Sequence, residues 1–175
     1  GVQTFRVYPT GTQVSEGLAP ALSFQDLSLA ADAFYTLIVH APFEGRTALV
    51  LEDRRAEIPA GQAAARMVHV AAGLDPISMR LRESFSSESG EVALGYNVVF
   101  GAARPAVSVA AAFDWIGYID VISQAGDDYF GRLTTPAAGS LINVIAVNSS
   151  DELKLLLQAD DGSVQPMRFV APPAP

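Results

Sequence analysis

The sequence contains no cysteine. This absence excludes disulfide bonds, thiolate zinc sites and cysteine nucleophiles, although it does not identify a cellular compartment. Long hydrophobic runs are also missing, because none approaches the roughly 18–20 residues that a membrane-spanning helix needs. No segment has the pattern of a signal peptide. Since the chain starts at Gly1 rather than methionine, we expect a processed or trimmed product, which leaves room for a targeting segment upstream.

Basic charge is scarce. The 11 lysine and arginine residues stand against 19 aspartates and glutamates, which gives a formal net charge of −8. Such an acidic chain repels phosphate backbones, so we expect no nucleic-acid partner. Hydrophobic residues, by contrast, make up 50% of the 175 residues. The chain is therefore expected to fold, either as one large domain or as two small ones.

Short apolar segments recur at intervals of about ten residues, separated by Gly, Pro, Ser and Asp clusters. Helical periodicity is weak, so the pattern predicts an all-β fold, an antiparallel β-sandwich. The strands are expected at Thr4–Tyr8, Ser23–Leu29, Phe34–His40, Thr47–Leu51, Ala65–Val70, Ile77–Arg82, Val92–Phe100, Pro105–Ala110, Trp115–Ile122, Leu133–Pro136, Ser140–Val147 and Leu153–Gln158. Pro105 marks its strand as an edge strand, because proline cannot donate to a ladder. The Asp-Gly sequence at Asp161 favours a hairpin turn after the last strand.

An internal repeat suggests how these strands are grouped. Ser28–His40 matches Thr135–Val147 at an offset of 107 residues, and each segment is followed by an aliphatic run and an acidic pair. The polar connector 53–61 is the expected boundary. We therefore predict three parts: residues 1–58 as the C-terminal half of a first β-sandwich unit, residues 59–170 as a complete second unit, and residues 171–175 as a Pro-rich tail.

The half unit supplies about four strands, which are too few to close two sheets. The apolar faces of its strands must therefore be buried against another part of the chain or against a second molecule. We expect residues 1–58 to pack on the complete unit or to complete a sandwich with a second molecule, which makes a homodimer one expected assembly.

Several of these segments resemble a bacterial family, the domain-of-unknown-function family 4397. Arg66–His69 falls on the family's strand of alanine, arginine, two hydrophobic residues and histidine, and Tyr35-Thr36 falls on a later strand motif. The chain departs from the family at Asp32, where glycine is expected, and at Ile142-Asn143, which replaces a Tyr-Thr pair. The resemblance implies tandem immunoglobulin-like units, one and a half of them here, in an exported or lipid-anchored protein. It implies no catalytic residues.

The two histidines, His40 and His69, are candidate ligand-binding residues because imidazole binds metals and transfers protons. Each lies on an apolar strand, where a buried imidazole satisfied by backbone groups is the alternative. Trp115, the single tryptophan, is the third candidate. With Phe113 and Tyr118 it would form an aromatic platform for carbohydrate, and the alternative is a core anchor.

Acidic pairs on loops are the candidate metal ligands, because Ca²⁺ prefers clustered oxygen atoms. The sequence has three acidic pairs, Glu52-Asp53, Asp127-Asp128 and Asp160-Asp161, and the last two are the candidate ligands. None of the three matches a calcium-loop motif, and turn formation alone explains acids in Asp-Gly turns. Calcium is thus the only cofactor that the sequence suggests, and otherwise none is expected.

The sequence as a whole predicts a non-catalytic exported module, periplasmic, secreted or lipid-anchored, that serves as a structural or binding part of the cell envelope. Its partner would be a protein or a cell-surface glycan, and the chain is not expected to span a membrane. The alternative is a hydrolase outside the cytoplasm that uses carboxylates from the acidic loops. A pocket that gathers His69 or His40 with two carboxylates would favour the enzyme.

Overall fold

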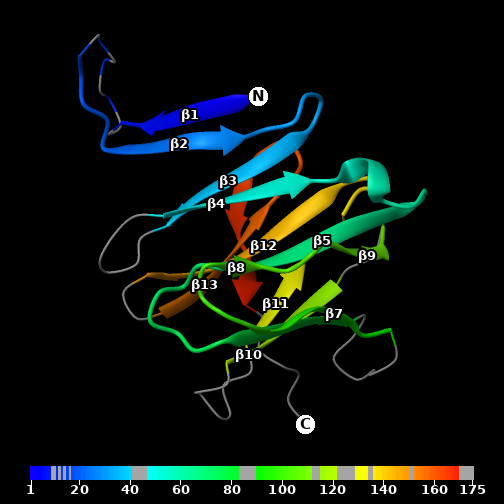
Figure 1. Cartoon of the computed structure of the whole chain (residues 1–175). Coiled ribbons are helices and arrows are strands. Elements are labelled where there is room, and N and C mark those ends of the chain that lie inside the picture. The colour runs from blue at the N-terminus through cyan, green and yellow to red at the C-terminus, as the bar shows by residue number, and fades with distance from the viewer. Residues whose placement is uncertain are drawn as a thin grey trace. The chain divides into compact units, whose positions relative to one another are not determined.

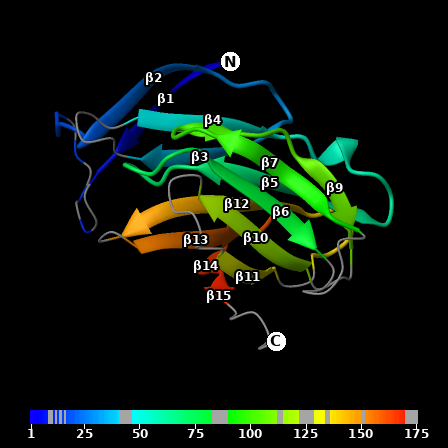
Figure 2. The same cartoon turned by 90° about the horizontal axis from the view of Figure 1, so that it is seen from below.

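The structure is a computed structural model that describes residues 1–8, 11, 13, 15, 17–40, 47–82, 90–111, 115–121, 129–133, 136–149 and 152–169 (Figures 1 and 2). Within these ranges the regular elements are β-strands and one turn of 3-10 helix, η1 (Arg55–Glu57). The predicted all-β class is therefore confirmed. The chain divides into two compact units, Gly1–Asp53 and Arg54–Pro175.

The first unit consists of two antiparallel hairpins. One joins β1 (Val2–Val7) to β2 (Leu22–Ser28), and the other joins β3 (Phe34–His40) to β4 (Thr47–Asp53). Within the second hairpin the Thr36 hydroxyl donates a hydrogen bond of 2.8 Å to Oδ2 of Asp53. The Tyr35 hydroxyl accepts a 3.0 Å hydrogen bond from the Ala30 N–H, which ties the start of β3 to the segment after β2.

The second unit contains two sheets. The five-stranded sheet has the order β15-β11-β10-β6-β7, and the six-stranded sheet has the order β14-β13-β12-β5-β8, with β9 also paired to β5. The strands are β5 (Gln62–His69), β6 (Ile77–Arg82), β7 (Val92–Val98), β8 (Ala102–Ala103), β9 (Val107–Ala110), β10 (Trp115–Val121), β11 (Tyr129–Leu133), β12 (Leu141–Ser149), β13 (Glu152–Gln158), β14 (Val164–Pro166) and β15 (Arg168–Phe169).

The hydrophobic core draws its residues from both sheets, so the unit is a two-layered sandwich of sheets. On β6 the predicted alternation is observed in part: Ile77, Met79 and Leu81 are fully buried, and Arg80 and Arg82 are half-buried. Ser78, which was expected to face water, is also buried. Every second residue of β5, β12 and β13 joins this core, because alternate side chains of a strand share one face. Burying each large aliphatic side chain contributes about 1.5–3 kcal/mol.

One ladder contradicts the prediction of a purely antiparallel sandwich. Strand β5 pairs in parallel with β12, and Arg66 lies opposite Asn143. Parallel neighbours need a long connection between them. Here the connection from β5 to β12 contains the strands β6 to β11.

Other differences concern strand ends. Leu133 ends β11 rather than opening a strand, and β7 ends at Val98 because the chain turns at Gly101, whose φ is 76°. The three short strands β8, β14 and β15 were not predicted, since two or three residues carry no periodic signal. The predicted tail, residues 171–175, lies outside the described residues.

Candidate functional site

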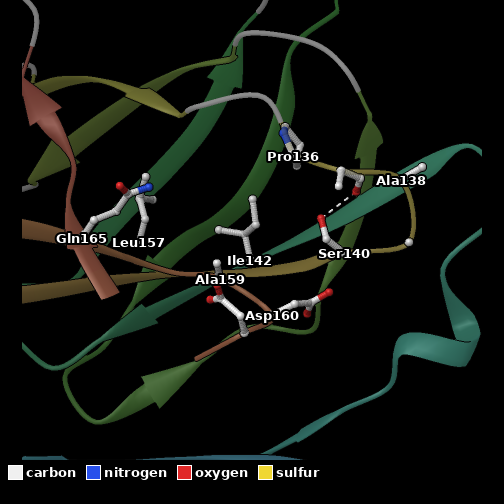
Figure 3. A pocket seen from close by; sticks show the side chains of 11 residues that line it. Pro136, Ala138, Ser140, Ile142, Leu157, Ala159, Asp160 and Gln165 are labelled. Carbon is white, nitrogen blue, oxygen red and sulfur yellow. Dashed lines mark hydrogen bonds between the residues drawn. The ribbon is translucent and has the colours of Figure 1, made fainter. Parts of the chain in front are cut away.

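A pocket of about 410 Å³ opens at one end of the six-stranded sheet (Figure 3). Its walls come from the turn before β12, the first residues of β12, the last part of β13 and the turn that leads into β14. The antiparallel register pairs Asn143 near the start of β12 with Gln158 at the end of β13, which places both turns at the same end of the sheet. The residues that matter most for its chemistry are Pro136, Ser140, Ile142, Leu157, Asp161 and Gln165.

The turn before β12 is fixed by glycine geometry and by backbone bonds. Gly139 has a φ of 79°, a left-handed conformation that glycine adopts without steric cost. Its N–H donates to the carbonyl of Gln62 at 2.7 Å, which anchors the turn to β5. The Ser140 hydroxyl donates to the carbonyl of Ala137 at 2.6 Å. The wall on this side is therefore held in place before any ligand arrives.

The opposite wall is the β13–β14 hairpin turn, where the sequence predicted a hairpin and the antiparallel pairing confirms it. Gly162 has a φ of 80°, and its N–H donates to the carbonyl of Ala159 at 3.0 Å. The Ser163 N–H donates to Oδ1 of Asp161 at 2.8 Å. This bond orients the Asp161 carboxylate beside the pocket.

The interior of the pocket is apolar and its rim is polar. In Figure 3, Ile142 projects from the sheet between Pro136 on one side and Asp160 on the other, and Leu157 lies beside Gln165. Ile142 and Leu157 are also members of the buried core. The pocket volume lies in the range of small-molecule sites, and an apolar interior with a few polar groups is the usual composition of such sites.

The two aspartates of the pocket differ in their electrostatic role. The Asp160 carboxylate accepts a hydrogen bond from the Leu141 N–H at 3.1 Å and pairs with Nε of Arg55 at 3.3 Å. Its charge is therefore balanced by a cation. The hydroxyl and the N–H of Ser163 lower the pKa of Asp161, so this exposed carboxylate stays ionised and makes the rim negative.

His69, a predicted ligand-binding residue, lies away from the pocket in the core of the second unit. Its side chain is fully buried, its Nδ1 accepts a hydrogen bond of 3.3 Å from the Ala71 N–H, and its ring meets Phe100 edge to face with centroids 6.1 Å apart. Burial lowers the pKa of His69, and backbone groups of Asp75 and Leu74 partly oppose that shift. Nε2 has no hydrogen-bond partner among the described residues.

His40, the other predicted histidine, ends β3 in the first unit. It is half-buried, and burial lowers its pKa. The pocket therefore gathers two carboxylates but neither histidine, so the arrangement that would favour the enzyme prediction is not present in the described part of the chain.

Trp115 corrects the prediction of an aromatic platform. Its side chain is only 2% exposed, belongs to the core, and donates a hydrogen bond from Nε1 to the carbonyl of Ala110 at 3.1 Å. A buried ring cannot stack on a sugar. Its neighbour Phe113 lies outside the described residues.

The predicted metal ligands are only partly described. Asp127 and Asp128 lie outside the described residues, whereas Asp160 and Asp161 line the pocket. Over the described ranges, no three His, Asp or Glu side chains group closely enough to hold a metal ion. Calcium binding stays a prediction.

The pocket itself was not predicted from the sequence, and Ser140, Ile142, Leu157 and Gln165 were missed. Two turn signals flank it, Pro136 to Gly139 before β12 and the Asp-Gly turn after β13. Pairing the two strands as a hairpin would have brought both turns together.

A scan against models of protein families and a search of curated proteins both returned no match to this sequence. The resemblance to the domain-of-unknown-function family therefore stays a prediction. Across the described ranges, no helix has the length and apolar character needed to cross a membrane.

Proposed function

We propose that the chain is a non-catalytic binding module that acts outside the cytoplasm and recognises a small group presented by a protein or cell-surface partner. The observation that carries the proposal is the pocket before β12, which has fixed walls, an apolar interior and a polar rim. Such a cavity suits the capture of one chemical group, because its walls need no rearrangement when the group enters.

The groups around the pocket support binding rather than catalysis. The Ser140 hydroxyl donates to the backbone carbonyl of Ala137 rather than to a carboxylate, so it is not arranged as an activated nucleophile. A carboxylate hydrolase needs one protonated carboxyl group as a general acid. The pKa of Asp161 is instead lowered, which favours its ionised form, and the Asp160 carboxylate forms an ion pair with Arg55. These states suit electrostatic attraction of a ligand and give the hydrolase alternative little support.

The immunoglobulin-like classification and the tandem repeat belong to the same proposal. Two face-to-face sheets in which β10 neighbours β6, and β12 neighbours β5, agree with the crossed connections of Greek-key sandwiches. The first unit repeats the hairpin order of β10 to β13. Strands β2 and β11 begin 107 residues apart, at Leu22 and Tyr129, and strands β3 and β12 also begin 107 residues apart, at Phe34 and Leu141.

We expect sedimentation velocity to show a dimer if the half unit completes a sandwich with a second molecule, and a monomer would contradict that assembly.

An exported location rests on the resemblance to the bacterial family. Fractionation of the native host, followed by an antibody against this chain, is expected to find it outside the cytoplasm. Recovery in the cytoplasmic fraction would contradict this part of the proposal.

The binding role is tested with 1-hexanol, a neutral probe that fits an apolar pocket. In amide-detected NMR titrations of the whole chain, 1-hexanol is expected to shift signals of Ile142, Leu157 and Ala159. Ala138→Trp places a large side chain at the pocket wall and should abolish these shifts. Ala106→Trp, at an exposed alanine away from the pocket, is the matched control and should retain them. Shifts that survive in Ala138→Trp, or that never occur, would overturn the binding role of this pocket.

A further inference from the structure

We propose that the pocket takes an aliphatic chain that ends in a primary ammonium group, the chemistry of a lysine side chain. This inference rests on the proposed function, because it names the ligand class of the same pocket. The apolar interior would hold the aliphatic stem, and the Asp161 carboxylate at the rim would hold the cationic end.

The stem is inferred from the walls. Ile142 and Leu157 are 8% and 5% exposed, and they face the pocket together with the buried Pro136. Such walls offer no hydrogen bonds to a sugar ring or to a hydrated ion. They do stabilise methylene groups. Each methylene group that moves from water into an apolar site increases the affinity of the ligand about fourfold.

The positive charge of the ligand is inferred from the rim. No lysine, arginine or histidine is among the described residues that line the pocket, and the nearby Arg55 is paired with Asp160. The Asp161 carboxylate thus gives the rim an uncompensated negative charge. The formal net charge of −8 also favours the approach of a cation.

The hydrogen-bonding capacity of an ammonium group suits the polar atoms of the rim. An ammonium group has three N–H donors and no acceptor. The Asp161 carboxylate is the charged acceptor of the rim, and the Ser140 hydroxyl and the Gln165 amide oxygen are neutral acceptors on opposite sides of the pocket (Figure 3). A divalent metal ion, by contrast, would leave the apolar walls without a role, which is why the proposal commits to an aliphatic ammonium group.

Three probes with the same six-carbon stem separate the charge from the stem: n-hexylamine, 1-hexanol and hexanoate. By NMR titration of the whole chain, we expect n-hexylamine to bind most tightly and hexanoate least tightly. The preference for the amine over the alcohol should shrink as salt is added, because salt screens an exposed carboxylate. Along a series from n-propylamine to n-hexylamine, affinity should rise by about fourfold for each added methylene.

The decisive variant is Asp161→Asn. Asparagine keeps an oxygen that accepts the Ser163 N–H and removes only the charge. The preference for n-hexylamine over 1-hexanol should be lost in this variant and retained in Asp75→Asn, which removes an exposed charge elsewhere in the same unit. If wild-type protein binds both probes equally at the pocket, the ammonium inference is wrong while the binding module stands. If neither probe binds there, both are wrong.

The aliphatic ammonium group could belong to a lysine side chain of a protein or to a free amine, and ligands of different size distinguish these two sources. Lysine with both its amino and carboxyl ends capped as amides carries the same stem on a backbone, whereas n-butylamine carries the stem alone. Binding of capped lysine at least as tight as that of n-butylamine would indicate a protein partner. Binding of n-butylamine with exclusion of capped lysine would indicate a free amine, and failure of both at the pocket would contradict the proposal.

Discussion

Nε of Arg66 donates a hydrogen bond of 2.8 Å to Oδ1 of Asn143 across the parallel strands β5 and β12. Both side chains are buried, with 5% and 3% of their surface exposed. Asn143 in turn donates from Nδ2 to Oε1 of Gln158 at 3.0 Å. A polar chain thus crosses three neighbouring strands, because buried polar groups require partners, and it links the two strands whose parallel pairing was not predicted.

We expect Asn143→Leu and Arg66→Met each to destabilise the second unit by about 2–3 kcal/mol, since each variant leaves the other polar group buried with fewer partners. The double variant should cost clearly less than the sum of the two single changes. Urea denaturation followed by Trp115 fluorescence measures this, because the single tryptophan lies in the core of that unit. Additive costs would show that the two residues act independently.

The turns before β3 and β12 share a left-handed residue at matching positions. Asp32 has a φ of 57° and Gly139 a φ of 79°, and Asp32 is where the family resemblance calls for glycine. Because a β-carbon is unfavourable in this conformation, Gly139→Ala should destabilise the second unit by about 1–2 kcal/mol. Asp32→Gly should raise the stability of the first unit by up to about 1 kcal/mol.

Thermal unfolding checks both changes. Asp32→Asn is the control, since asparagine tolerates the left-handed conformation as well as aspartate does and should change little. A loss of stability in Asp32→Gly, or no loss in Gly139→Ala, would contradict the equivalence of the two turns.

His69 predicts a pH dependence of stability. Burial lowers the pKa of His69 below its ordinary value of 6.5, so as the pH falls the unfolded chain binds a proton before the folded chain does. The contribution of neutral His69 is therefore fully present above about pH 7 and is lost as the pH falls below 6.5 toward the lower folded pKa. Urea titrations read by Trp115 fluorescence should show this decline in wild-type protein and a flatter profile in His69→Leu.

A second pH-dependent loss of stability, at more acidic pH and due to Glu91, serves as the internal control. The hydrogen bond from Arg82 lowers the pKa of Glu91 from 4.5, so its contribution is present above that value and is lost only as the pH falls through the folded pKa. Glu91→Gln should flatten the acidic window and leave the His69 window unchanged. An unchanged slope near neutral pH in His69→Leu would show that His69 does not titrate on unfolding.

The strands with long apolar alternation were predictable because period-2 patterning is a local property. Ile77, Met79 and Leu81 are buried as that pattern requires, and Pro105 lies just before an edge strand, which tolerates its missing N–H. The parallel pairing of β5 and β12 was not predictable, because the residues that specify it, Arg66 and Asn143, are far apart in the sequence.

The candidate site was harder to predict for a related reason. The sequence predicted site residues from side chains that can bind metals or sugars. Two of them, His69 and Trp115, are buried in the core, where their apolar surface is used for packing. The pocket instead depends on Ile142 and Leu157, which look like ordinary core residues until two turns leave space beside them. Only the tertiary arrangement creates that space.

The measurement that tests the binding role of this pocket most directly is the set of intermolecular nuclear Overhauser effects between n-hexylamine and the methyl groups of the whole chain. The account predicts contacts from the terminal methyl group of n-hexylamine to Ile142 and Leu157, with the ammonium end near Asp161. Bound n-hexylamine whose contacts lie only at other residues would contradict it.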